Sequence, residues 1–290
     1  MLLSDLVNKN GEIRMNLRWR FGMCLYRDGR YNEAEVSFME VAERRKKVLG
    51  AEHPGTLTSM AKLASTYRNQ GRWKQAKELG VLIIETRKRV LGAEHPNTLT
   101  SMDDLALTYM NQGRWKEAEE LQLQVMEAKR RVLGAEHLST LTSMANLAST
   151  YMNQGRLKEA EELEVQVIEI RKRVLGAEHP STLTSMGKLA STYRKQGRWK
   201  EAKELEEIRK RVLGAEHPDT LTSMVNLAHA WKGQGRYAEA LELMEECIKL
   251  QVQIMGVSHP YTLSSSVTLT IWRTEKLKIS ASAVEDLDSQ

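Results

Sequence analysis

Leu175-Gly-Ala-Glu-His-Pro180 is one copy of a hexapeptide that recurs along this chain of 290 residues. The spacings between successive copies are 42, 42, 42, 38 and 42 residues, with the glycine at Gly50, Gly92, Gly134, Gly176, Gly214 and, in a diverged copy, Gly256. A period of roughly 20 to 50 residues is typical of stacked units that bury their apolar faces only against their neighbours. The sequence therefore predicts a repeat array and not a compact domain around one core.

The copy between Leu138 and Pro180 indicates how one unit folds. Apolar residues recur there at helical spacing in two segments, which Gly155 separates and Gly176 ends. The second segment is acidic at its start and basic at its end, as the helix dipole favours. In most copies a proline opens the next unit at a helical position where a missing N–H costs nothing. Each unit is therefore predicted to be a helix–turn–helix.

The pattern Leu147-Ala148-x-x-Tyr151-x-x-x-Gly155-x-x-x-x-Ala160 resembles the tetratricopeptide repeat. The period of 42 residues and the L-G-x-x-H-P-x-T linker resemble the subclass found in kinesin light chains. The same subclass occurs in the sensor arms of NB-ARC- and NACHT-type signalling ATPases. The resemblance implies an all-α, right-handed solenoid of tandem helix–turn–helix repeats, and we expect more than about 75% helix.

The repeats divide the chain into an array and two short ends. We expect an N-terminal segment over residues 1–11, the repeat array over 12–277 and a disordered acidic tail over 278–290. The shortened fifth pair lacks four residues, about one helical turn, and is predicted to keep the stacking with a shorter second helix. The predicted pairs are 12–47, 54–90, 96–132, 138–174, 180–212 and 218–254, followed by a capping helix over 260–277.

Composition narrows the cellular setting and the class of partner. The chain carries a net charge of +5 and only two cysteines, Cys24 and Cys247, which excludes a disulfide framework. It has no apolar stretch of the roughly 20 residues that a membrane span requires, and no secretory signal. We expect a cytoplasmic protein that contacts neither membrane nor nucleic acid.

Much of the positive charge recurs at one place, the end of each second helix. Because cations there complement the helix dipole, we interpret these residues as solvated helix ends and not as a polyanion-binding stripe. The clusters are Arg44–Lys47, Arg87–Arg89, Lys129–Arg131, Arg171–Arg173 and Arg209–Arg211.

Two other recurring residue types have structural interpretations. One histidine per unit, with no second ligand nearby, predicts a residue that caps the next helix and not a metal site. Trp73, Trp115 and Trp199 align with other large apolar residues and are interpreted as core. No phosphate-binding loop or nucleophile with its base is present. We therefore expect no enzyme activity, no cofactor and no small-molecule substrate.

The copies are nearly identical, so the positions at which they differ are informative. In the first helix of each unit the variable positions share one face, opposite the packed leucine and tyrosine. By resemblance, this face lines the concave groove of a tetratricopeptide array; random drift is the alternative. The candidate binding residues are Lys62, Ser65, Arg68, Asn69, Asp103, Asp104, Leu107, Met110, Asn111, Asn146, Ser149, Met152, Asn153, Lys188, Ser191, Arg194, Lys195, Asn226, His229 and Lys232.

This face predicts a protein scaffold or adaptor that binds a peptide segment of a partner. Its charges favour a mainly acidic peptide with an apolar anchor beside Leu107, Met110 and Met152. Kinesin-light-chain grooves are similar in receiving short acidic peptides with an aromatic anchor. Serines stand where many tetratricopeptide clamps carry asparagine, which argues against a clamp for a free C-terminal carboxylate. The alternatives are the sensor arm of a signalling ATPase and a polyanion binder.

Overall fold

A computed structural model describes the backbone of residues 2–288 and the side chains of residues 11–276. The chain is 84% helical, and residues 2–288 contain no β-strand, which confirms the predicted all-α class of tandem helix pairs. The helices are α1 (Leu2–Arg27), α2 (Tyr31–Leu49), α3 (Pro54–Asn69), α4 (Trp73–Leu91), α5 (Pro96–Asn111), α6 (Trp115–Leu133), α7 (Leu138–Asn153), α8 (Leu157–Leu175), α9 (Pro180–Lys195), α10 (Trp199–Leu213), α11 (Pro218–Gly233), α12 (Tyr237–Met255) and α13 (Pro260–Asp288).

The first and last helices extend over the two predicted end segments. Helix α1 begins at Leu2 and runs through the predicted N-terminal segment, and α13 continues to Asp288 where a disordered tail is predicted. Neither proline nor glycine follows Pro260 to stop α13, which accounts for the helical extension. The division into segment, array and tail stays a prediction.

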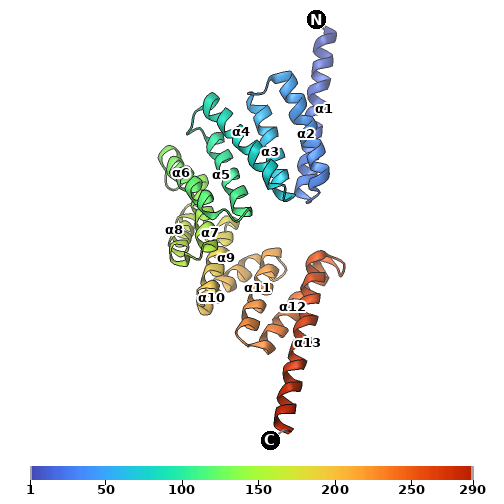
Figure 1. The fold of residues 1–290 in the computed structure, drawn as a ribbon, viewed down its shortest axis with the longest axis vertical. Helices are drawn as coiled ribbons and strands as arrows, with labels where there is room; N and C mark the ends of the chain where they lie inside the picture. Colours follow the sequence, from blue (N-terminus) through green and yellow to red (C-terminus); the bar gives the residue numbers. More distant parts are fainter. Residues whose placement is uncertain (1, 289–290) are drawn as a thin grey trace. The chain divides into compact units, whose positions relative to one another are not determined.

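The chain divides into two compact units, residues 1–163 and 164–290, and the boundary between them falls within the sequence of α8. In residues 1–163 each helix packs on the next along the chain from α1 to α7, and α3 also touches α5. In residues 164–290, α9 packs on α10, α11 on α12 and α12 on α13. Figure 1 shows these successive helices running side by side as antiparallel neighbours within each unit. We call the odd-numbered helices inner and the even-numbered helices outer.

The linker between pairs is fixed by one glycine and one histidine. Gly134 has φ of 96°, a left-handed backbone that other residues rarely adopt. His137 then caps α7, because its Nδ1 accepts the N–H of Ser139 at 3.1 Å. The predicted capping role is confirmed for His53, His95, His137, His179, His217 and His259.

Replacing His137 by alanine should lower the free energy of unfolding by about 1 kcal/mol, since the first turn of α7 loses its side-chain acceptor. Replacement by asparagine, which can cap in the same way, should recover most of that loss. Urea unfolding of both variants and the parent measures the difference. Equal loss in the two variants would contradict the capping role.

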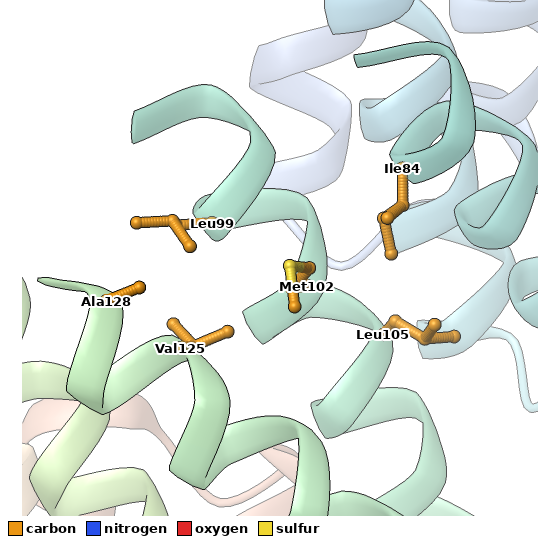
Figure 2. Packing of buried hydrophobic residues seen from close by; sticks show 6 residues of the cluster. All are labelled: Ile84, Leu99, Met102, Leu105, Val125 and Ala128. Carbon is orange, nitrogen blue, oxygen red and sulfur yellow. The ribbon is translucent and has the colours of Figure 1, made fainter. Parts of the chain in front are cut away.

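An inner helix is buried between two outer helices. In one cluster Ile84 of α4 packs on Leu105 of α5, while Val125 of α6 covers the other end of α5. Figure 2 shows Met102 of α5 between these contacts. The methionines at this position are buried in α5, α7, α9 and α11. The core is therefore a row of local clusters and has no single centre.

The two helices of a pair meet at small residues. Ala148 of α7 and Ala160 of α8 are both completely buried, and the same pair of alanines recurs in α5–α6, α9–α10 and α11–α12. Side chains without a Cγ allow the helix backbones to approach closely.

Replacing Ala148 by leucine should therefore destabilise the protein by about 1–3 kcal/mol through overpacking. Thermal or urea unfolding measures the effect. Lys158→Leu, at an exposed position on α8, is the control and should change the free energy of unfolding little.

The four-residue deletion shortens α10 to 15 residues, compared with 19 in the other outer helices from α2 to α12. Pairing with α9 is retained, which confirms the predicted shorter second helix, but α10 touches α11 only lightly.

Candidate functional site

One basic residue near the end of each outer helix from α2 to α10 is bonded to the next inner helix; α12 carries Gln251 at this position. In α4, Arg87 donates from Nη1 to the carbonyl of Asn97 at 2.8 Å and to Oγ of Ser101 at 2.5 Å. Its side chain is only 5% exposed, and burial lowers its pKa. The equivalent residues Arg45, Lys129, Arg171 and Arg209 bond Ser59, Ser143, Ser185 and Ser223 in the same way.

The interpretation of these clusters as solvated helix ends is thus wrong for Arg87, Lys129, Arg171 and Arg209, which are buried. Their side chains are long enough to reach the start of the following helix, where a serine hydroxyl accepts a hydrogen bond from each of them. A main-chain carbonyl accepts a second hydrogen bond from Arg87, Lys129 and Arg171. These cations hold the repeats together and do not face a polyanion.

The candidate binding residues lie on inner helices in both units. In residues 1–163 the exposed ones are Asn69, Asn111 and Asn153, which occupy the same position at the ends of α3, α5 and α7, and Ser65 is buried. The half-buried ones are Lys62, Arg68, Asp103, Asp104, Leu107, Met110, Asn146, Ser149 and Met152. In residues 164–290, Lys195, Asn226 and His229 are exposed, whereas Lys188, Ser191, Arg194 and Lys232 are half-buried.

Asp103 is bound inside the protein. Its carboxylate pairs with Nζ of Lys129 in α6 and accepts the hydroxyl of Ser143 in α7 at 3.2 Å. Burial raises the pKa of Asp103 above its usual value, although Lys129 acts in the opposite direction. Lys129 is only 3% exposed, so this pair ties three helices together and presents little charge to a ligand.

Replacing Asp103 by alanine should destabilise the protein by about 3 kcal/mol, because it leaves the Lys129 ammonium buried without its carboxylate. Adding Lys129→Arg should recover much of this loss, since Ala145 and Arg171 form that natural combination in the next repeat. Chemical unfolding of the two single variants and the double variant gives the coupling energy. An additive double variant would contradict the assignment.

Other charges of the predicted face are paired as well. Arg68 donates to the carbonyl of Asp104 at 3.2 Å and to its carboxylate at 3.3 Å, linking α3 to α5. In residues 164–290, Arg194 contacts Glu206 at 3.1 Å, and Lys232 contacts Glu275 at 2.6 Å. Carboxylates of the same chain therefore neutralise part of the positive charge that the sequence places on this face.

A hollow of about 460 Å³ lies beside the turn between α3 and α4. Arg68, Asn69 and Asn111 of the predicted face line it together with Tyr31 and Trp73. Trp73 is 40% exposed, so its interpretation as core is wrong; as the first residue of α4 it lies at the edge of the repeat, where packing covers only part of the ring. The alignment of aromatic residues marks this position, but such alignment does not distinguish core from surface.

The arginines that follow the turn glycines, such as Arg72 and Arg156, are paired with glutamates of the preceding repeat. Arg72 stacks 4.3 Å from the centre of the Tyr67 ring and pairs with Glu35 of the preceding repeat at 2.7 Å. Arg156 does the same with Tyr151 and Glu119. This row of arginines is part of the stacking between repeats.

Among the described residues, no group of three histidine, cysteine or acidic side chains could hold a metal ion. None of the described helices combines the length and the apolar character that crossing a membrane requires.

Comparison with known families is decisive for the fold. One tetratricopeptide repeat model matches residues 98–139, 140–181, 182–219 and 220–261, and a second matches residues 14–81. The chain is a tetratricopeptide repeat protein. Such a repeat fold is typically a non-catalytic scaffold for protein interactions.

Solved structures agree with this assignment. A putative kinesin light chain of Podosopora anserina with nearly identical TPR-like repeats is 38% identical, with a TM-score of 0.60 over 69% of this chain and 97% of that chain. No curated protein matches.

Two more distant structures show the fold alone. A signal transduction ATPase with a tetratricopeptide repeat sensor from Pyrococcus horikoshii is 12% identical, with a TM-score of 0.65 over 91% of this chain and 39% of that chain. A Rap protein complexed with Competence and Sporulation Factor is 14% identical, with a TM-score of 0.59 over 95% of this chain and 80% of that chain.

Proposed function

We propose that this tetratricopeptide protein is a cytoplasmic adaptor whose inner-helix face binds a peptide segment of a partner protein. The observation that carries the proposal is the hollow lined by Trp73, Asn69 and Asn111. A partly exposed tryptophan offers a large apolar contact, and the amides offer donors and acceptors to a peptide backbone. Such a combination suits a short peptide segment better than a small metabolite, because the hollow is open to solvent and would enclose little of a small molecule.

The asparagines extend this surface along the first unit. Asn69, Asn111 and Asn153 repeat every 42 residues at the ends of three inner helices. Met110 and Met152 precede two of them and are half-buried, and a thioether adapts well to an apolar anchor. We infer that the amides bind the backbone of the segment and that the methionines receive one apolar side chain.

Charge contributes less to this recognition than the amides and the apolar contacts do. Lys62, whose Nζ lies 4.6 Å from the centre of the Tyr26 ring, is the cation of the first unit that we expect to favour acidic residues in the peptide. The pairing of Arg68, Arg194 and Lys232 with carboxylates within the protein argues for a moderate preference. The acidic character of the partner therefore rests on fewer residues than the sequence suggests.

A sensor arm of a larger signalling ATPase is the second candidate, and the Pyrococcus horikoshii protein is the observation that favours it. Polyanion binding is less well supported, since one basic residue in four of the five clusters is buried and the turn arginines Arg72 and Arg156 are paired with carboxylates. A P-loop domain joined to these repeats in the intact protein would favour the sensor arm.

The test is selection of binders from a displayed random peptide library with the full chain, followed by calorimetry on the selected peptide. Asn111→Ala and Trp73→Ala should each weaken binding about tenfold, or about 1.4 kcal/mol, through lost backbone bonds or lost apolar contact. Gln124→Ala removes an exposed amide from the outer helix α6 and should leave the affinity unchanged. Equal losses in all three variants, or no selected peptide, would count against this surface.

A further inference from the structure

The first and last inner helices each expose an apolar stripe. On α1 it consists of Ile13, Leu17 and Phe21, which follow one another at steps of four residues. On α13 the exposed residues Leu263, Val267 and Ile271 have the same spacing. We call these two sets the α1 stripe and the α13 stripe. All six side chains are at least half exposed, which is unusual for so many large aliphatic and aromatic residues at regular spacing.

The α1 stripe lies on the face that receives the preceding outer helix at an internal repeat junction. Alignment of Gly29 with Gly155 places Phe21 at the position of Leu147. Leu147 is 1% exposed and lies against Leu123 of the preceding helix α6, whereas Phe21 is 53% exposed. The α1 stripe is thus a repeat–repeat interface with one side uncovered.

Two further positions on this face are polar at the internal junction and apolar in α1. Leu17 replaces Ser143, and Cys24 replaces Thr150, both of which bond side chains of α6. An outer helix like α6 would place a residue equivalent to Lys129 against Leu17. Leucine has no hydroxyl to accept the hydrogen bond that Ser143 accepts from Lys129. The α1 stripe therefore fits an apolar, uncharged helix face.

The α13 stripe has these properties. Helix α12 packs on the opposite side of α13, against Leu269 and Trp272. Leu263 aligns with Leu141, which is buried in its own pair, but Leu263 is 52% exposed. Residues 260–272 contain no charged side chain, and serine and threonine hydroxyls flank the stripe.

Charge decides between the possible arrangements of two copies. Arg14 and Arg20 border the α1 stripe and are exposed, so two α1 helices face to face would bring like charges together. The uncharged α13 stripe avoids this repulsion. We propose that α1 of one copy packs on α13 of a second copy, so that the protein associates head to tail. Because this contact joins different surfaces, it produces a ring or a filament.

Sedimentation of the full chain over a range of concentrations tests the proposal. The parent protein should form assemblies that grow with concentration. Leu17→Glu blocks the α1 stripe and Val267→Glu blocks the α13 stripe, so each variant alone should be a monomer. An equimolar mixture of the two should give a heterodimer, because each partner retains one intact stripe.

Val132→Glu, at an exposed valine outside both stripes, is the control and should assemble like the parent. Circular dichroism checks that helix content is kept, and Ile13→Glu replaces Leu17→Glu if that variant loses helix. A Val267→Glu protein that dimerises on its own would instead assign the contact to two α1 helices. A monomeric parent or a monomeric mixture would overturn the proposal.

Discussion

The bond from a buried cation of one outer helix to the first turn of the next inner helix is the contact on which the repeat depends. A helix pair has no core of its own, so each junction must fix both the distance and the register of its neighbour. The guanidinium of Arg87 does this with one nitrogen, which binds a main-chain carbonyl and a serine hydroxyl. Hydrogen bonds of this charge-assisted kind offset the cost of burying the cation.

The partners of these cations differ from copy to copy. Lys129 has Asp103, whereas Arg209 has Glu206, and its guanidinium lies 2.7 Å from where a Cβ of Gly187 would be. Repeats that are nearly identical could also stack in a shifted order, with little loss of apolar contact. A buried ion pair finds both of its partners in only one stacking order of the repeats. It therefore disfavours the shifted arrangements. Part of the variation between copies therefore specifies neighbours and not ligands.

The sequence was sufficient to predict the helices, their caps and their order, because these depend on local signals that repeat. The histidine caps involve residues two positions apart, and the turn glycines mark each helix end. The charge of the candidate surface was not predictable in this way. Asp103 lies on the variable face of α5, but its partner Lys129 comes 26 residues later on another helix. Helical periodicity predicts which face of its helix a side chain lies on. It does not predict which side chain of another helix pairs with it.

The short outer helix α10 also has a consequence for motion. In a chain of units that contact only their neighbours, the weakest joint sets where cooperative blocks separate. Because α10 touches α11 only lightly, we expect α11, α12 and α13 to open as one cooperative block while α9 and α10 stay paired. A deletion of a single helical turn thus gives an otherwise uniform array a preferred point of local unfolding.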